Sequence, residues 1–272
     1  MTRIEETFTS AAGRPLFIAF IVAGDPDFER SVAAAGALIE GGADIIELGV
    51  PFLDPVADGP TIQRADARAL GAGATPAMVF EIVRRIRRFS TVPVVLLTYY
   101  NIVHHRGISR FYREAREAGI DGILIADMPV EESGPVMKEA AKTGIDQIYM
   151  VCETTSQERL ERILENAQGF LYLVSHMGVT GVLPALPPGA TAIVRYIRKK
   201  TCMPLAVGFG VATPYHAAEL YKAGADAAIA GSAIVAIIEK YQDDQEGMKK
   251  ALKDYALSMR AAGSSFTSPI TC

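Results

Sequence analysis

A glutamate lies inside an otherwise apolar segment of the sequence. Glu47 belongs to the run IIELGV and is followed by the loop PFLDPVADGPT. Burying a carboxylate among apolar side chains is costly, and desolvation raises its pKa toward the range used in general acid–base catalysis. Glu47 is therefore a candidate catalytic residue, with a hydrogen-bonded structural glutamate as the alternative. Asp54 and Asp58 lie in the loop, where aspartates ordinarily form turns beside proline and glycine.

Lysine and metal chemistry lack candidates in this sequence. The first lysine is Lys138, and no predicted strand end carries one, so a Schiff-base aldolase is disfavoured. The adjacent pair His104 and His105 does not have the spacing of metal ligands, and we expect no metal site. The three cysteines are widely spaced and odd in number, which predicts reduced thiols. Acid–base chemistry by carboxylates and tyrosines remains, with Tyr99 and Tyr172 near strand ends as possible donors or core residues.

Two glycine-containing segments predict a phosphate site. Val207-Gly208-Phe209-Gly210 follows one predicted strand, and Ala230-Gly231-Ser232-Ala233 follows the next and opens a helix. Glycines let backbone N–H groups approach phosphate oxygens, and a helix N-terminus adds a favourable dipole. Each segment alone could simply turn the chain. Together, after the seventh and eighth strands of a barrel, they favour phosphate binding.

A repeated phrase indicates the elements that position these residues. The sequences GGAD, AGID, TGID and AGAD, which begin at residues 41, 118, 143 and 223, each precede a short apolar run. Each contains a glycine suited to the left-handed end of a helix, and the run is typical of a parallel strand buried on both faces. Strands are predicted at 16–22, 45–48, 94–98, 122–125, 147–151, 170–174, 205–207 and 227–230. Helices are predicted at 29–40, 77–89, 109–118, 130–142 and 213–223, among others.

Eight strands alternating with helices in 272 residues predict a (β/α)₈ barrel, an α/β fold with residues 1–272 as one domain and extra helices. A doubly wound open sheet is the competitor, but the segment AGDP after the first strand is no dinucleotide fingerprint. The net charge is −4, and the sequence has no long block of basic residues, which argues against nucleic-acid binding. No apolar run reaches the roughly 18–20 residues of a membrane span, and the stretch 15–23 lacks a signal-peptide layout. We expect a soluble, cytoplasmic protein.

The run ELGVPFLDPVADGPTIQ at 47–63 closely resembles the signature of the tryptophan synthase α-subunit family. The similarity continues in the family's order and covers nearly the whole chain. It includes GDP at 24–26, YYN at 99–101, DMPVEE at 127–132, GVTG at 178–181, GFG at 208–210 and GSAIV at 231–235. The long run is highly specific, whereas GFG or GSA alone would be weak.

The resemblance implies a lyase of tryptophan biosynthesis that cleaves indole-3-glycerol phosphate to indole and glyceraldehyde-3-phosphate by a retro-aldol reaction. Glu47 matches the catalytic glutamate that moves protons between the indole C3 and the glycerol hydroxyl. Asp58 matches the aspartate that holds the indole N–H. The matched substrate positions are Phe20, Leu97 and Phe209 as walls around the indole, Tyr172 near the glycerol, and Thr180. The matched phosphate positions are Gly181, Gly210, Gly231 and Ser232.

The resemblance also implies a partner and two moving loops. The family pairs this chain with a β subunit in an α₂β₂ heterotetramer, and indole passes to that subunit. Pyridoxal phosphate belongs to the partner, so we expect no cofactor in this chain. The loops 53–60 and 177–188 are expected to close over the substrate and exclude water.

Four positions depart from the family's usual pattern: Val22, Leu53, Glu153 and His176. Threonine, serine, proline and arginine, respectively, are common there. The departures leave Glu47 and Asp58 in place but bear on loop closure and on signalling between subunits.

Three alternatives follow from the same residues. One is a stand-alone lyase that releases free indole, and another is a weakly active barrel that mainly activates the β subunit. Indole-glycerol-phosphate synthase, a related barrel, relies on lysine catalysis, which the lysine-free strand ends argue against.

Overall fold

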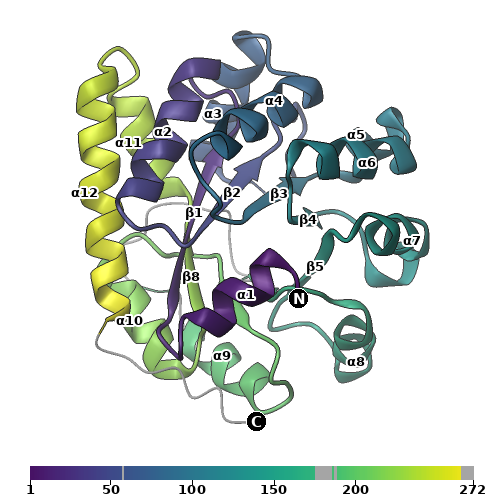
Figure 1. Ribbon diagram of the computed structural model, residues 1–272. Helices are drawn as coiled ribbons and strands as arrows, with labels where there is room; N and C mark the ends of the chain where they lie inside the picture. Colours follow the sequence, from purple (N-terminus) through teal and green to yellow (C-terminus); the bar gives the residue numbers. More distant parts are fainter. Residues whose placement is uncertain (57, 175–185, 187–188, 265–272) are drawn as a thin grey trace.

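The computed structural model describes residues 1–56, 58–174, 186 and 189–264. Eight parallel strands form a closed barrel in the order β1-β2-β3-β4-β5-β6-β7-β8. Helices surround the strands, and α12 runs beside α2 and α10 on one side of the molecule (Figure 1). The expected (β/α)₈ barrel is confirmed.

The strands are short and almost completely buried, as expected where a parallel sheet is covered on both faces. The predicted bounds of β1, β3, β4, β7 and β8 agree with the structure, β2 and β5 each gain one residue, and β6 loses one at each end. The strands are β1 (Leu16–Val22), β2 (Ile45–Gly49), β3 (Val94–Thr98), β4 (Gly122–Ile125), β5 (Asp146–Val151), β6 (Leu171–Leu173), β7 (Leu205–Val207) and β8 (Ala227–Ala230).

The predicted helix at 130–142 is divided in the structure. A 3₁₀ turn, η1 (Val130–Glu132), precedes α7 (Gly134–Thr143), which has a proline in its first turn. Proline lacks a backbone N–H and is favoured where a helix begins, so a new helix starts there. The other helices are α1 (Arg3–Ser10), α2 (Phe28–Glu40), α3 (Pro60–Gly71), α4 (Pro76–Arg87), α5 (Tyr100–Arg106), α6 (Ile108–Ala118), α8 (Gln157–Asn166), α9 (Ala190–Arg198), α10 (Pro214–Ala223), α11 (Ser232–Lys240) and α12 (Gln245–Gly263).

Alternating side chains along each strand form two apolar layers. One cluster fills the barrel interior, and the other packs between the strands and the surrounding helices. In β2, Ile45 belongs to the interior cluster, whereas Ile46 and Leu48 belong to the outer one. Because successive strand residues point to opposite faces, Glu47 faces the interior like Ile45.

Helix α1 closes the N-terminal end of the barrel. Its two buried residues, Ile4 and Phe8, belong to the interior cluster, and the Phe8 and Phe170 ring centroids lie 5.9 Å apart. Thr2 caps the helix by accepting from the Glu5 backbone N–H, and the Glu5 carboxylate accepts from the Thr2 N–H at 2.8 Å. This reciprocal capping box fixes the start of α1, which holds the helix across the barrel opening.

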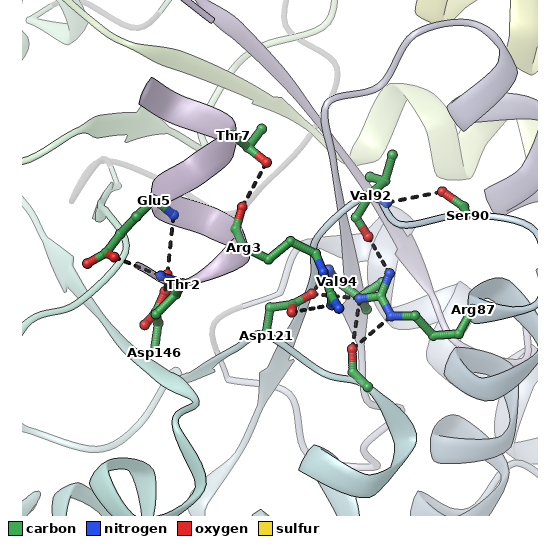
Figure 2. Close-up of polar contacts among 11 residues, drawn as sticks. Thr2, Arg3, Glu5, Thr7, Arg87, Ser90, Val92, Val94, Asp121 and Asp146 are labelled. Atoms are coloured by element: carbon green, nitrogen blue, oxygen red, sulfur yellow. Dashed lines mark hydrogen bonds and ion pairs between the residues drawn. The ribbon is translucent and has the colours of Figure 1, made fainter. Parts of the chain in front are cut away.

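The aspartates of the repeated phrase lie at this same end. Asp121 accepts hydrogen bonds from Arg3, from Arg87 and from the Val94 N–H at the start of β3 (Figure 2). Asp44 similarly binds Arg14 and the Phe17 N–H, and Asp226 binds Arg198 and the Leu205 N–H. Asp146 instead accepts from the Thr2 hydroxyl at 2.7 Å. In three of the four repeats, the aspartate therefore fixes the start of the preceding strand.

Candidate active site

Glu47 lies inside the barrel near the carboxyl end of β2. Its Cα is paired in register with Phe20 on β1 and Val95 on β3, and its side chain is 1% exposed. Burial raises the pKa of Glu47 to about 8; the Tyr172 hydroxyl opposes this rise and the nearby Asp58 charge adds to it. Among the described residues, no hydrogen-bond partner reaches Oε1. Glu47 thus has a free oxygen and a pKa near neutrality, which suits a group that both gives and takes a proton.

Tyr172 on β6 is the polar neighbour of Glu47. Its hydroxyl donates to Oε2 over 3.5 Å, at the long limit of a hydrogen bond. The ring packs so closely on Gly208 that a Cβ there would lie 2.2 Å from Cε1 of the tyrosine. Glycine at 208 is therefore needed for the Tyr172 ring to occupy its place beside Glu47.

Asp58 is held at the carboxyl end of the barrel by two polar contacts. The Tyr99 hydroxyl donates to Oδ2 at 2.7 Å, and the Gln63 side chain donates to the Asp58 backbone carbonyl at 2.7 Å. Burial raises the pKa of Asp58, and the Tyr99 hydrogen bond opposes that rise. The second carboxylate is therefore positioned by a tyrosine from the neighbouring strand end and by the first turns of α3.

The predicted phosphate positions in the described part of the chain follow β7 and β8, which pair in the barrel. Gly210 has φ +67°, a conformation that favours glycine. Gly231 is the N-cap of α11 and has no side-chain capping hydrogen bond, and Ser232 is the first residue of that helix. The backbone N–H groups at the start of α11 are therefore not capped by the Gly231 position, which suits an anion.

Phe20 connects the two ends of the site. A Cβ at Gly231 would lie 3.0 Å from its ring, and a Cβ at Gly49 would lie 2.8 Å from it. Phe20 shares the interior cluster with Leu97 and Tyr172. An apolar surface therefore runs between the carboxylate on β2 and the start of α11, as an aromatic substrate bearing a phosphate requires.

Residues 8–264 match the family described as "Tryptophan synthase alpha chain". The chain belongs to this family. The described carboxylates, the tyrosines beside them and the glycines after β7 and β8 all lie within the matched range.

Individual members of the tryptophan synthase alpha chain family are similar over almost their whole lengths. The chain is 54% identical over 262 residues to the tryptophan synthase alpha chain of Methanoregula boonei, covering 96% of this chain and 98% of the relative. It is 45% identical over 249 residues to that of Methanothermobacter thermautotrophicus, covering 92% of each. The crystal structure of tryptophan synthase subunit alpha from Legionella pneumophila superimposes with a TM-score of 0.90 at 35% identity, covering 98% of this chain and 100% of that one.

A chain of the tryptophan synthase α₂β₂ complex from Pyrococcus furiosus is also similar. It superimposes with a TM-score of 0.83 at 36% identity, covering 92% of this chain and 99% of that one. Family membership therefore rests on sequence and on three-dimensional structure together.

Several predicted positions do not join the cluster around Glu47 and Asp58. Phe209 is buried but packs with the outer apolar cluster, so its role as an indole wall stays a prediction. Thr180, Gly181 and His176 lie outside the described residues. Of the other departures from the family pattern, Val22 is buried in the barrel interior and Leu53 is 85% exposed. Glu153 is exposed after β5.

Two residues near the site were not found by the sequence reasoning. Asp66 on α3 is 5% exposed, and burial raises its pKa to about 8. Arg68 on the same helix binds Asp25 bidentately at 2.8 and 2.9 Å. The spacing of Ile62, Asp66 and Ala69 by four and three residues places them on one face of the helix, and this pattern could have indicated from the sequence that Asp66 is buried. Asp127, which follows β4, accepts a hydrogen bond from the Tyr100 N–H at 2.7 Å and so fixes the loop after β3.

Across residues 1–56, 58–174, 186 and 189–264, no group of three histidine, cysteine, aspartate or glutamate side chains could hold a metal ion. In the same described part, no helix is both long and apolar enough to cross a membrane. Cys152 is a free thiol, whereas Cys202 is disulfide-bonded, so the prediction of reduced thiols is wrong for Cys202.

Proposed function

We propose that this chain cleaves indole-3-glycerol phosphate to indole and glyceraldehyde-3-phosphate, as the α subunit of a tryptophan synthase. The observation that carries the proposal is the pair of carboxylates at one end of the barrel. Glu47 is buried and has a pKa of about 8, and Asp58 lies at the same end. Two carboxylates with no lysine at the strand ends fit a retro-aldol reaction run by proton transfer.

Glu47 acts first as an acid and then as a base. Below a pH of about 8 it is neutral and donates its proton to C3 of the indole. The bond between C3 and the adjacent glycerol carbon then breaks, and its electron pair restores the aromatic ring. The Glu47 carboxylate takes the proton of the hydroxyl on that carbon, which becomes the aldehyde. Glu47 ends the cycle as it began, so no co-reactant is needed.

Asp58 stabilises the charge that appears during this sequence. Protonation at C3 places positive charge on the indole ring and its nitrogen. The ionised Asp58 accepts a hydrogen bond from the indole N–H, and the Tyr99 hydroxyl holds the carboxylate in place at 2.7 Å. A fixed charge aimed at the developing cation contributes most in a site that excludes water.

The remaining predicted positions bind the substrate. Phe20, Leu97, Tyr172 and Phe209 are the apolar surroundings of the indole and the glycerol, and Thr180 belongs to the loop that closes over them. The phosphate is bound by backbone N–H groups at Gly181, Gly210, Gly231 and Ser232, helped by the dipole of α11. The chain itself carries no cofactor, acts within one domain and works in the cytoplasm.

A β subunit is the proposed partner. The P. furiosus protein that this chain resembles is part of an α₂β₂ complex. In this chain, Leu53 and Val56 are 85% and 76% exposed in the segment that leads to Asp58. Apolar side chains at the mouth of the site suit contact with another subunit that receives the indole.

The test is to mix the purified chain with indole-3-glycerol phosphate, with and without a β subunit, and to measure indole. Because the substrate carries the same indole ring, the released indole is separated by extraction or chromatography before it is quantified. Indole release that rises with the β subunit and is lost in Glu47→Gln is the expected result. Release by the chain alone, unchanged by any β subunit, would favour the stand-alone lyase. No release under either condition would refute the enzyme and leave a regulatory barrel.

A further inference from the structure

Asp66 is a buried carboxylic acid that the proposed reaction does not use. It lies on the inner face of α3, whose neighbouring buried residues Ile62, Ala65 and Ala69 belong to the interior apolar cluster. One of its oxygens, Oδ2, has no hydrogen-bond partner among the described residues. A buried polar atom without a partner costs free energy, so a carboxyl group here calls for an explanation.

A chain of contacts links Asp66 to Asp58. The backbone N–H of Phe52 interacts with the carboxyl group of Asp66 and opposes the rise in its pKa. The Phe52 ring stacks on Tyr99, with centroids 5.0 Å apart and planes inclined by 26°. The Tyr99 hydroxyl donates to Asp58 at 2.7 Å. Asp66 thus holds the backbone of the residue whose ring supports the tyrosine that binds Asp58.

The charges around Asp66 keep it neutral. Burial raises its pKa to about 8, and the nearby Asp58 and Asp25 add to the rise, whereas the Phe52 N–H opposes it. The two arginines nearest to Asp66 along α3 are already paired: Arg68 with Asp25 and Glu239, and Arg64 with Glu239. At neutral pH, Asp66 is therefore an uncharged hydrogen-bonding group that adds no second negative charge beside Asp58.

We propose that Asp66 is a positioning residue for Asp58: it anchors the Phe52 backbone, and the Phe52 ring seats Tyr99 so that its hydroxyl reaches Asp58. The proposal rests on the role of Asp58 given above. In this proposal Asp66 supports the loop before α3, in addition to the contact between the Gln63 side chain and the Asp58 carbonyl.

The test compares Asp66→Asn, which keeps an oxygen acceptor and cannot ionise, with Asp66→Ala, which removes the acceptor. Asp54→Asn is the control, because Asp54 is exposed in the same loop. Fluorotyrosine incorporation with ¹⁹F NMR reports the Tyr99 ring, and Tyr99→Phe identifies its signal among the ten tyrosines. Phe52→Ala removes the ring stack without altering Asp66, and so tests the same chain of contacts if Asp66→Ala does not fold.

The expected result is a shifted Tyr99 signal in Asp66→Ala and Phe52→Ala, and an unchanged one in Asp66→Asn and Asp54→Asn. The first two variants should bind indole about tenfold more weakly, the effect of losing one hydrogen bond to a charged group. A Tyr99 signal and an indole affinity unchanged in Asp66→Ala and Phe52→Ala, or equal damage from Asp66→Asn and Asp66→Ala, would overturn the proposal.

This design separates the positioning role from the reaction. If the parent chain forms no indole but the Tyr99 signal shifts in Asp66→Ala, the proposed function fails and the positioning contact stands. If the parent chain forms indole and none of the Asp66 or Phe52 variants changes the Tyr99 signal or the kcat/KM for cleavage, the positioning role fails and the function stands.

Discussion

Buried carboxylates have different partners at the two ends of the barrel. At the N-terminal end, Asp44, Asp121 and Asp226 each form an ion pair with arginine and accept a backbone N–H at the start of a strand. Figure 2 shows this arrangement around Asp121. At the carboxyl end, the described neighbours of Glu47 and Asp58 are tyrosine hydroxyls, and no arginine or lysine contributes to either pKa.

The difference separates structural carboxylates from those available for chemistry. A carboxylate that is paired with arginine and hydrogen-bonded to the backbone has no oxygen left for a substrate, and its charge is compensated. Burial raises the pKa of Asp121 as well, but Glu47, buried beside a tyrosine, keeps an oxygen without a hydrogen-bond partner among the described residues. Burial alone therefore does not identify a catalytic acid in this barrel. The side chain that pairs with the carboxylate, arginine or tyrosine, is what distinguishes the two roles.

The largest expected effect is on catalysis, in Glu47→Gln. The amide fills the same space but cannot donate a proton to C3 or take one from the hydroxyl. We expect indole formation to fall by about 10²–10⁴-fold, the contribution of a positioned acid or base. Single-turnover measurements with saturating indole-3-glycerol phosphate would check this.

The free energy of unfolding of Glu47→Gln shows whether a loss of activity reflects a catalytic or a structural role of Glu47. The folded pKa of Glu47 is raised from 4.5 to about 8, so the folded state holds a proton that the unfolded state loses, and stability falls as pH rises through that window. Glu47→Gln should abolish this fall and be at least as stable as the parent at neutral pH. A variant that is both inactive and less stable at neutral pH would show that Glu47 is a structural residue like Asp121.

The next effect is on stability, in Asp121→Asn. The change leaves Arg3 and Arg87, which are 41% and 16% exposed, without their carboxylate. Removing one partner of a buried ion pair costs about 3 kcal/mol or more, so the urea midpoint should fall markedly. The activity per folded molecule should stay unchanged, because the contact lies at the opposite end of the barrel.

Glu139→Gln is the matched control for that prediction. Its partner Lys142 is 68% exposed, and solvent screens the attraction between exposed charges, so this variant should lose little stability. Equal losses of stability in Asp121→Asn and Glu139→Gln would contradict the difference that we draw between the buried and exposed pairs.

A smaller catalytic effect is expected in Tyr99→Phe. The change removes the donor to Asp58, and a hydrogen bond to a charged group contributes about 1.5–3 kcal/mol, or roughly 10–100-fold in kcat/KM. The Tyr99 hydroxyl also opposes the rise in the Asp58 pKa, so the acidic limb of the pH profile should move to higher pH. Tyr100→Phe is the control, because Asp127 holds its backbone N–H. Equal kcat/KM values for the two variants would remove Tyr99 from the site.

Much of the fold could be predicted because its signals are local. The repeated glycine–aspartate phrase marks helix ends and strand starts, and each strand is a short apolar run with a clear beginning. The division between η1 and α7 was missed because the helical pattern continues across Ser133 and Gly134, while the break comes from a proline. The structural role of the repeated aspartates was also missed, since their arginine partners come from distant segments such as Arg3 and Arg198.

The candidate site was predictable only in part, for a similar reason. Glu47 is visible as a charge inside an apolar strand, and the family signature places Asp58 beside it. The support of Asp58 by Tyr99, and that of Phe52 by Asp66, depends on contacts between separate loops and a helix. The packing of Phe209 in the outer cluster likewise depends on which way one side chain turns after β7, which the sequence does not specify.

The smallest expected effect comes from the exception at the N-terminal end. Asp146 is 2% exposed, and it accepts a hydrogen bond from the Thr2 hydroxyl at 2.7 Å (Figure 2). Burial raises its pKa from 3.8 to about 6, against the opposing Thr2 contact, so stability should fall as pH rises from about 4 to about 6. Asp146→Asn keeps an acceptor for Thr2 and has no charge to desolvate. Urea unfolding across this pH range should show a flatter profile and a neutral-pH stability within about 1 kcal/mol of the parent. A loss as large as that of Asp121→Asn would mean that position at the N-terminal end, and not the arginine partner, makes a buried aspartate structural.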